Sequence, residues 1–447
     1  MAVDYVAVGK RTKRADAPVR LTGAARFAAD LRPAGLLHAR PVGSPYAHAT
    51  IKSVDRSAAL AIPGVVAVLT ADDLPFADRA AAEAGKWPIA FGEALYVGQF
   101  VAIVLAETEA AAEDGVAAVE IEYDELDSVN TIDAGLEFAT PAVRKVGIGG
   151  DNAEASMHNA DAASGGGEAE KLPINVTNSI HFHRGDVAAG FAEADATVEL
   201  TFTSQTVHQG YIEPQVAMAA IDPLGDLTVY TATQALFYCR SKVSETLGYP
   251  AHRVKVEAMP VGGGFGGKFV LIEPLVALLA VAAQRPVLLY TRMEDFVAGN
   301  PAPECKVTLK AGAKQDGTLT ALQGQASFDS GSTSGSPLSI GCILMGGYYK
   351  TPNLDIRGYE VLTNRAAAGA YRAPGAQQGT YAIESVIDEL ARKLEMDPLE
   401  FRLKNCVEEG DPRANNAPWP RIGLKETLEA LKAHPAWQNR ESARAKG

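Results

Sequence analysis

Five glycines surround one phenylalanine in residues 261–269, which read Val-Gly-Gly-Gly-Phe-Gly-Gly-Lys-Phe. Residues 254–259 before this loop alternate like a β-strand, and residues 271–283 after it form an apolar stretch long enough for a helix. Glycine lets a backbone adopt left-handed conformations and come close to a bulky ligand. A strand, a glycine loop and the beginning of a helix together predict an anion-binding site.

The loop also contains the glycine spacing of two nucleotide-binding motifs. Gly262, Gly264 and Gly267 fit the dinucleotide fingerprint, but no acidic residue closes a second strand about twenty residues further on. Residues 262–268 have the spacing of a phosphate-binding loop, yet Phe269 stands where serine or threonine would hold magnesium. A tight structural turn is the third interpretation. The loop alone does not decide between them.

Composition restricts the class of protein. The 447 residues are 47% hydrophobic and 21% charged, as in globular proteins of about two to four domains. A net charge of −13 without a dense basic run argues against nucleic acid as a partner. The amino end lacks a secretory signal, and charges and prolines interrupt the longest apolar stretch, residues 270–290. We therefore expect a cytoplasmic protein without a membrane span.

The cysteines are far apart in the sequence. None forms a Cys-x-x-Cys motif, so we expect neither a zinc site nor an iron–sulfur cluster on this chain. Buried free thiols are the expected state of all of them, namely Cys239, Cys305, Cys342 and Cys406.

Apolar periodicity divides the chain into an arm, two folded segments and a connector. Residues 1–19 form the arm, and residues 20–136 alternate short strands with helices, as in a compact α+β domain. Residues 137–175 are interpreted as a linker or insertion, because residues 147–172 within them are rich in Gly, Ala, Ser, Asn and acidic residues. Residues 176–447 form the second folded segment. Expected strands are 36–42, 65–69, 100–105, 120–123, 196–202, 227–231 and 305–310, with a turn at 316–317 and helices at 107–119, 382–395 and 424–431.

Several further motifs accompany the glycine loop. They are residues 208–214 (His-Gln-Gly-Tyr-Ile-Glu-Pro), 233–234 (Thr-Gln), 369–378 (Gly-Ala-Tyr-Arg-Ala-Pro-Gly-Ala-Gln-Gln), 382–384, 388–391 and 397–402. In order and spacing they resemble the first half of the molybdenum-cofactor-binding large subunit of the xanthine dehydrogenase and aldehyde oxidase family. Residues 21–30 and 93–126 resemble the hammerhead domain of that family. The resemblance covers nearly the whole chain and implies an α+β fold, with an N-terminal hammerhead domain followed by the first molybdopterin-binding domain.

The resemblance also assigns roles to single residues. Glycines would bring backbone N–H groups to anionic oxygens, Phe265 would form a wall beside the metal, and an amide would donate a hydrogen bond to an oxo ligand. The implied cofactor-binding residues are Gln234, Gly263, Gly264, Phe265, Gly266 and Arg372. The implied substrate-pocket residues are Phe269, Tyr371 and Pro374. No side chain is expected to bind the metal, because the family holds molybdenum through the pterin sulfurs.

Each residue also has a structural interpretation. Gln234 could be a polar residue at a strand end, and Arg372 a surface arginine. His208 is expected to make a structural hydrogen bond rather than to bind metal. Glu213, which precedes Pro214, is expected to fix a turn.

The family's general base implies a second polypeptide. Family members hydroxylate a carbon centre with water as the oxygen source, and a glutamate in a Gly-x-Gly-Glu motif of the second half removes a proton. Residues 165–168 match that motif, but they lie in the connector and we attribute the match to chance. No catalytic residue is therefore expected in this chain, and the base is expected on a second molybdenum-binding subunit. Truncation of a longer gene product is the alternative.

Further cofactors and partners follow from the resemblance. It implies molybdopterin with molybdenum, in the cytosine dinucleotide form, and electron transfer to a [2Fe–2S] subunit and an FAD subunit. Phe269 and Pro374 replace residues that purine-oxidising relatives use, and Ile340 stands near the place of a substrate-orienting arginine, which disfavours xanthine. The Cys-Ser-Phe-Arg loop of carbon monoxide dehydrogenases is absent too. An aldehyde or an N-heteroaromatic compound is the expected substrate.

Two other functions compete with a hydroxylase subunit. One is a non-catalytic assembly protein that binds molybdopterin but lacks the base. The other is a nucleotide-binding protein that uses the glycine loop of residues 261–269.

Overall fold

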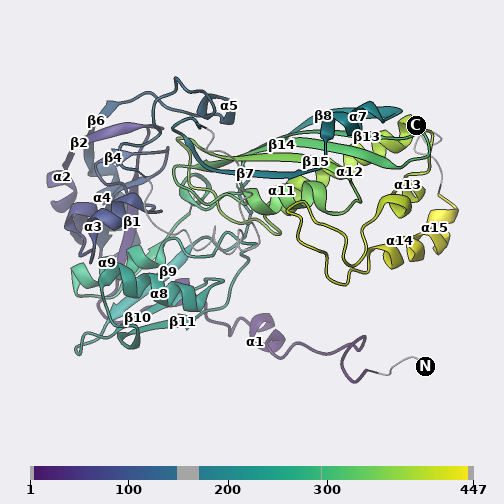
Figure 1. Cartoon of the computed structure of the whole chain (residues 1–447). Helices are drawn as coiled ribbons and strands as arrows, with labels where there is room; N and C mark the ends of the chain where they lie inside the picture. The colour runs from purple at the N-terminus through teal and green to yellow at the C-terminus, as the bar shows by residue number, and fades with distance from the viewer. Residues whose placement is uncertain (1–4, 148–170, 293, 441–447) are drawn as a thin grey trace.

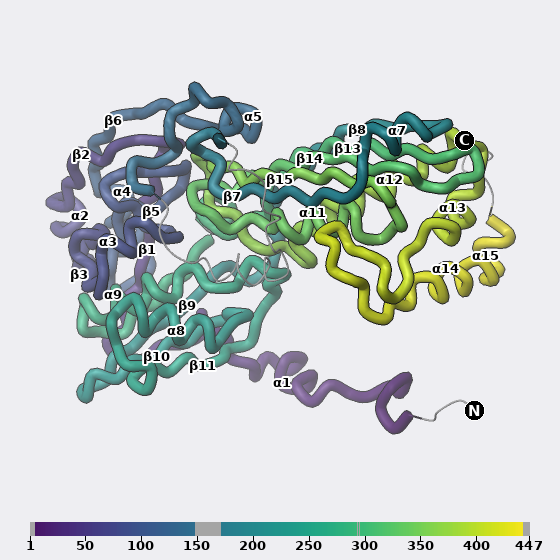
Figure 2. Tube along the Cα trace, in the orientation of Figure 1, coloured from purple at the N-terminus to yellow at the C-terminus, as the bar shows by residue number. Residues whose placement is uncertain are grey.

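Three β-sheets organise the chain, and together they form two lobes (Figure 1). The computed structural model describes residues 5–147, 171–292 and 294–440. The hammerhead segment and a seven-stranded sheet form the lobe on the left of Figure 1, and a five-stranded sheet with its helices forms the lobe on the right. The N-terminal arm, which contains helix α1 (Ala17–Leu21), extends away from the lobes at the lower edge of Figure 1, as the tube in Figure 2 also shows.

The seven-stranded sheet combines strands from both folded segments of the sequence. Its order is β11-β10-β9-β12-β1-β5-β3, and β1 pairs in parallel with β12, with Leu37 opposite Val287. The strands are β1 (Leu37–Gly43), β3 (Val65–Leu69), β5 (Phe100–Ala106), β9 (Val216–Ile221), β10 (Leu227–Thr231), β11 (Val254–Ala258) and β12 (Val287–Tyr290). The boundaries near residues 136 and 176 stay predictions, and one sheet and one apolar core join the segments on either side of them.

Short helices and a three-stranded sheet complete the hammerhead segment. Helix α4 packs on β1 and β5, because its Ala111 and Ala112 are small enough for close contact with the sheet. The sheet order is β4-β2-β6. The elements are β2 (Ala49–Asp55), β4 (Glu93–Ala94), β6 (Glu120–Glu125), α2 (Ser57–Leu60), α3 (Arg79–Ala84), α4 (Glu109–Ala118) and α5 (Ile132–Gly135), with 3₁₀ turns at Ala28–Asp30 and Ala71–Asp73.

Two helices cover the part of the seven-stranded sheet that leads to the glycine loop. Helix α8 (Leu236–Leu247) connects β10 to β11, and α9 (Glu273–Ala283) connects the glycine loop to β12. Every residue of α9 from Glu273 to Ala280 is buried, because the helix packs on β9, β10 and β12 and also contacts α8. The beginning of α9 is therefore inside the protein.

The five-stranded sheet has one apolar face and one polar face. Its order is β7-β15-β14-β13-β8, and helices α11 and α12 cover the apolar face. Side chains alternate between the faces, so Ile180 and Phe182 are buried while His181 and His183 lie on the other side. The elements are β7 (Val176–Arg184), β8 (Ala196–Ser204), β13 (Cys305–Ala313), β14 (Leu319–Gly331), β15 (Asn353–Leu362), α7 (Val187–Ala192), α10 (Asp295–Ala298), α11 (Leu338–Gly347), α12 (Ala376–Lys393), α13 (Pro398–Asn405), α14 (Leu424–Ala433) and α15 (Pro435–Gln438).

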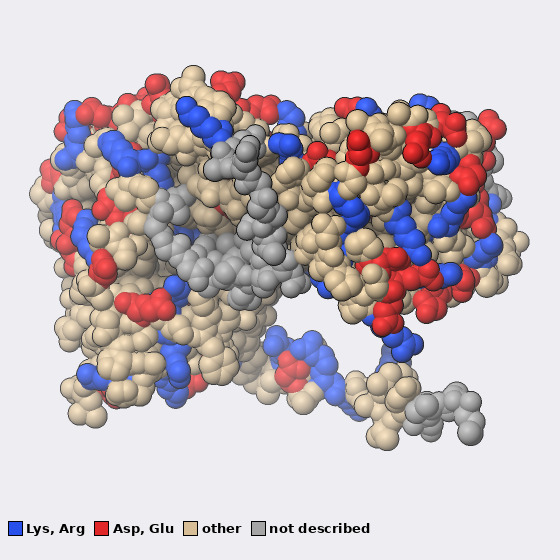
Figure 3. Space-filling model, viewed as in Figure 1, with Lys and Arg blue, Asp and Glu red and all other residues tan. Residues whose placement is uncertain are grey.

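Most elements expected from the sequence are confirmed. The turn at 316–317 closes through Gly317, whose N–H donates to the carbonyl of Lys314 over 2.8 Å, and all four cysteines are buried and free. Residues 165–168 and most of the predicted connector lie outside the described residues. Within the described ranges, no helix has both the length and the apolar character needed to cross a bilayer. On the face seen in Figure 3, Lys and Arg side chains alternate with acidic ones and form no continuous basic surface.

A buried ion pair in the hammerhead segment makes its stability dependent on pH. His48 Nε2 lies 2.9 Å from Glu93 Oε1, and His48 Nδ1 lies 2.7 Å from the carbonyl of Asp127. Burial acts to lower the pKa of His48, but the bonds to Glu93 and Asp127 outweigh it and raise the pKa above 6.5. Burial acts to raise the pKa of Glu93, and the bond from His48 outweighs it, so that the pKa falls below 4.5.

We expect His48→Gln to destabilise the protein mainly in mild acid. The raised pKa of His48 gives stability that is present below about 6.5 and is lost as the pH rises through the folded-state value. The lowered pKa of Glu93 gives stability that is lost as the pH falls below about 4.5. The variant should lose about 1 to 2 kcal/mol near pH 6 and less near pH 8.5, measured by urea unfolding at both values. An equal loss at both would contradict the ion pair.

Candidate functional site

The glycine loop has the backbone conformation that its sequence predicts. It follows β11, and Gly263 and Gly266 have φ angles of 98° and 102°, while Phe265 has a φ of 51°. A Cβ atom on Gly266 would lie 2.5 Å from the carbonyl oxygen of Ala370. The loop therefore presses against the segment of residues 369–375, and only glycine fits at this contact.

This second segment brings the two lobes together. The N–H of Arg372 donates to the carbonyl of Phe265 over 2.9 Å, and Gln209 Nε2 donates to the carbonyl of Ala370 over 2.8 Å. The segment leads directly into α12, so it belongs to the lobe of the five-stranded sheet. Two motifs that are far apart in the sequence thus lie side by side, as the resemblance implied.

The amide oxygen of Gln234 binds the backbone of the glycine loop, while its amide nitrogen remains available as a donor. Its Oε1 accepts hydrogen bonds from the N–H groups of Gly266 (2.9 Å) and Lys268 (3.3 Å). Because both partners are donors, the amide oxygen must be the inward atom, and Nε2 must point away from the loop. Among the described residues, none accepts a hydrogen bond from this Nε2. An exposed amide donor therefore stands beside Phe265.

Further donors remain available around the two loops. No described residue accepts a hydrogen bond from the N–H groups of Gly263, Gly264 or Phe265, although Gly264 is buried. The Arg372 guanidinium is exposed, and within the described ranges it has no acidic partner. The first turn of α12 contains no acidic residue and has no side-chain cap. This set of donors fits an anionic ligand rich in oxygen, as a molybdopterin cofactor is.

The sequence prediction of an anion site at the beginning of α9 is wrong. Glu273 occupies that helix end itself: its carboxylate accepts hydrogen bonds from the N–H of Leu271 (3.0 Å) and the hydroxyl of Thr231 (2.8 Å). Burial raises the pKa of Glu273. An anionic ligand therefore cannot bind at this helix end, because the Glu273 carboxyl group already occupies it and the surrounding protein is buried. The helix end next to the two loops is instead the beginning of α12, which has no side-chain cap and was not predicted as part of the site.

Sequence reasoning also missed how the glycine loop is held. Glu213 was expected only to fix a turn, but its Oε2 accepts from the N–H of Gly262 (2.7 Å) and from Lys268 Nζ (2.6 Å). Gln215 Nε2 donates to the carbonyl of Gly267 over 2.7 Å. His208, as predicted, makes a structural hydrogen bond, because its Nδ1 accepts from the N–H of Gly210. Glu213 lies in a motif about fifty residues before the glycine loop, and nothing in the sequence indicated that its carboxylate binds this loop.

The residues predicted to line the substrate pocket border the same loops. The ring of Phe269 lies against Tyr238 of α8, with 5.1 Å between the centroids. Tyr371 and Pro374 are half-buried on either side of Arg372. Their contact with a substrate stays a prediction.

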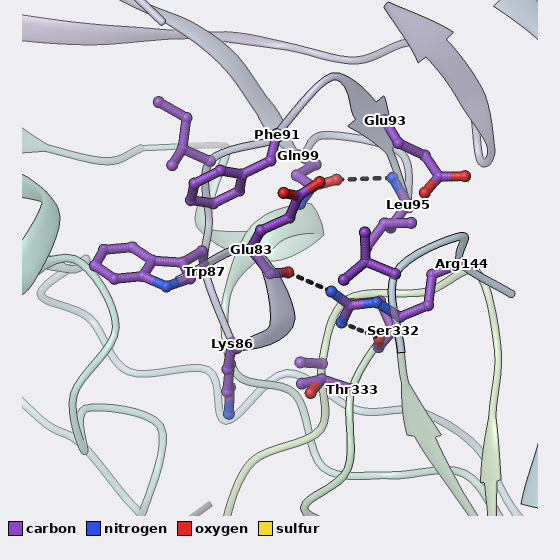
Figure 4. A pocket seen from close by; sticks show the side chains of 14 residues that line it. Glu83, Lys86, Trp87, Phe91, Glu93, Leu95, Gln99, Arg144, Ser332 and Thr333 are labelled. Carbon is purple, nitrogen blue, oxygen red and sulfur yellow. Dashed lines mark hydrogen bonds between the residues drawn. The ribbon is translucent and has the colours of Figure 1, made fainter. Parts of the chain in front are cut away.

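A partly open pocket between the lobes is too small to be the cofactor site. Arg144 crosses it, donating to the carbonyls of Glu83 (2.5 Å) and Ser332 (3.2 Å), and its lining includes Trp87 and Phe91 (Figure 4). The volume is about 30 Å³, which is room for about one water molecule. This pocket joins the hammerhead segment to the other lobe, and the glycine loop is not part of its lining.

Comparison with known proteins identifies the family. The model of the molybdopterin cofactor-binding domain matches residues 169–406, and that of the aldehyde oxidase and xanthine dehydrogenase a/b hammerhead domain matches residues 22–127. The chain belongs to the xanthine dehydrogenase and aldehyde oxidase family. It is a molybdopterin-binding large subunit of this family of molybdenum-dependent oxidoreductases, with the hammerhead fold followed by the cofactor-binding domain.

Similar proteins differ in length. The probable hypoxanthine oxidase XdhD of Escherichia coli K12 is 33% identical, over 91% of this chain and 45% of its own length. The nicotinate dehydrogenase large molybdopterin subunit of Eubacterium barkeri is 31% identical, over 96% of both chains. The crystal structure of quinoline 2-oxidoreductase from Pseudomonas putida 86 superposes with a TM-score of 0.83 at 28% identity, covering 100% of this chain and 57% of that one. The chain thus spans about half the length of the first of these relatives.

Proposed function

We propose that the two loops hold a molybdenum-containing molybdopterin between the lobes. The observation that supports this assignment is the hydrogen bond from the Arg372 N–H to the carbonyl of Phe265, which joins the two loops that carry the donors. The cofactor-binding residues in this proposal are Gln234, Gly263, Gly264, Phe265, Gly266 and Arg372. The cofactor is expected in its cytosine dinucleotide form.

Each group has a distinct task in this proposal. When bound, the molybdenum centre supplies the two-electron oxidation of a carbon centre with water as the oxygen source. Gln234 Nε2 would donate a hydrogen bond to an oxygen of the bound cofactor, because the amide oxygen already accepts from the N–H groups of Gly266 and Lys268. The Arg372 guanidinium offers a fixed fork of donors. Phe265, which is 49% exposed, would help to exclude water from the bound cofactor.

An aldehyde or an N-heteroaromatic compound is the proposed substrate. Relatives of the chain are named for quinoline, nicotinate and hypoxanthine, and another is an aldehyde oxidoreductase. The apolar Phe269 and Pro374 border the proposed site, and their surfaces favour a less polar ring over xanthine.

The proton acceptor and the electron acceptors are proposed to lie on other subunits. Exposed apolar side chains border the two loops, among them Ile212 at 95% exposure, Phe237 at 83% and Phe265. Apolar surface of this kind is typical of a protein interface, and we assign it to a second molybdenum-binding subunit that supplies the glutamate base. The match to the nicotinate dehydrogenase large molybdopterin subunit over 96% of its length supports a molybdenum site that is divided between two subunits. Because all four cysteines are buried, the [2Fe–2S] cluster is proposed to lie on a further subunit. An FAD subunit is proposed from the family resemblance alone, and a cytoplasmic location stays a prediction.

We expect Gln234→Glu to lose cofactor without loss of fold. The new carboxylate keeps an inward oxygen for the N–H groups of Gly266 and Lys268, but it presents a second acceptor where a donor is needed. Molybdenum content and turnover of the co-purified complex should fall by about tenfold or more, because a hydrogen bond to a charged group contributes about 1.5 to 3 kcal/mol. Arg372→Ala should act similarly.

Arg421→Ala is the matched control, because Arg421 is also exposed and lies outside both loops. The wild-type complex should contain molybdenum, iron and flavin. A metal-free chain that binds ATP would instead support the nucleotide-binding alternative, and a molybdopterin-loaded chain without turnover in any complex would support the assembly protein. Normal molybdenum content in both Gln234→Glu and Arg372→Ala would remove the site assignment.

A further inference from the structure

A group of potential metal ligands lies on the polar face of the five-stranded sheet. In the antiparallel pair of β7 and β15, His183 stands opposite Asp355, and His181 follows two residues away on the same face. The intervening Phe182 is buried in the apolar core, which fixes the direction of both imidazoles. The sheet therefore presents two histidines and one carboxylate together, without a loop that would have to order first.

The three side chains are already close to a coordinating arrangement. His181 Nε2 lies 2.9 Å from Asp355 Oδ1, and one potential ligand atom from each residue lies within 4.8 Å of the other two. Among the residues that the structure describes, no other three His, Cys, Asp or Glu side chains meet this distance. Rotation of the exposed His183 side chain would bring its nitrogen to the 3 to 3.5 Å spacing, about that between ligands of a tetrahedral ion.

Access and charge favour a cation at this place. His183 and Asp355 line an open pocket of about 600 Å³, together with Gln323 and Asp186. Arg357 Nε lies 3.7 Å from Asp355 Oδ1, longer than a hydrogen bond, and its side chain is 44% exposed. An arriving ion would compete with this guanidinium for the Asp355 carboxylate.

We propose that His181, His183 and Asp355 bind one divalent transition-metal ion of the zinc type. Imidazole nitrogen with one carboxylate oxygen is a ligand set for zinc and its neighbours, whereas magnesium and calcium require mainly oxygen. Three protein ligands leave at least one coordination position open to water or to a further ligand. The ion would fasten β7 to β15. The proposal does not depend on the molybdopterin site, which lies at the loops between the lobes.

Equilibrium dialysis of the full chain against Zn²⁺, without a polyhistidine tag, tests the site. The wild-type protein is expected to bind one ion per chain, and the buried cysteines should not compete. His183→Ala and Asp355→Asn should each weaken the affinity by at least about tenfold. His252→Ala is the matched control, because His252 is exposed and lies outside the group. Zn²⁺ should also raise the melting temperature of the wild-type protein but not that of His183→Ala.

Cu²⁺ as a spectroscopic probe gives an independent reading. Its electron paramagnetic resonance spectrum should show two nitrogen ligands in the wild-type protein and one in His183→Ala. The proposal is overturned if saturable Zn²⁺ binding is absent, or if the His181→Ala/His183→Ala double variant binds Zn²⁺ as tightly as the wild type. Equal affinity for Mg²⁺ would also overturn it, since that result would indicate an unspecific acidic surface.

Discussion

Gly266→Ala is expected to destabilise the protein by about 2 to 4 kcal/mol and to lower its molybdenum content. Two effects add: alanine is strained at a φ of 102°, and its Cβ would lie 2.5 Å from the carbonyl oxygen of Ala370. The two loops must move apart to relieve that overlap. This movement should weaken the neighbouring hydrogen bond from the Arg372 N–H to the carbonyl of Phe265. Urea unfolding of the chain and metal analysis of the complex measure the two results.

Gly410→Ala separates backbone strain from the overlap. Gly410 has a φ of 89°, close to that of Gly266, but a Cβ on it would meet no atom within 4 Å. This control should therefore lose only about 1 kcal/mol and keep its full molybdenum content. If both variants lost the same stability, backbone strain alone would explain the need for glycine. The close contact between the two loops would then not be the reason.

Local sequence patterns were sufficient for the elements but not for their assembly. Strands such as Val65–Leu69 and Leu227–Thr231 have the predicted bounds, because their apolar alternation is a local property of the chain. The shared sheet could not be foreseen in the same way. The sheet is joined by the parallel pairing of β1 with β12, where Leu37 lies opposite Val287. These strands are far apart in the sequence, and the apolar sequence of each would suit many partner strands.

At the candidate site, sequence motifs indicated the two loops but not the residues that support them. Gln234 and Arg372 belong to recognisable motifs, and the structure places their segments together. Glu273 was read as an interruption of an apolar stretch, whereas it closes the beginning of α9. Its effect depends on burial and on two hydrogen bonds, and neither is encoded in spacing. The same holds for Glu213, whose contact with Lys268 arises only after the chain folds.

Lys268→Met is expected to cost about 3 to 5 kcal/mol, the largest loss among the variants considered. The side chain of Lys268 is 1% exposed, and its Nζ lies 2.6 Å from Oε2 of Glu213, which is itself only 12% exposed. Methionine has a similar length but no charge, so it leaves a buried carboxylate without a counter-ion. Urea unfolding at neutral pH measures the loss.

The Glu213→Gln/Lys268→Met double variant tests whether the loss comes from the pair itself. A neutral glutamine still accepts the hydrogen bond from Gly262 N–H, so the double variant should be more stable than Lys268→Met alone. A loss equal to the sum of the two single losses would contradict a coupled pair. Glu213 fixes the beginning of the glycine loop and Gln234 fixes its end, which leaves the N–H groups of residues 263–265 free between them. The double variant should therefore recover part of the stability that Lys268→Met loses, because the glycine loop keeps its hydrogen bond at Gly262 and no buried charge is left unpaired.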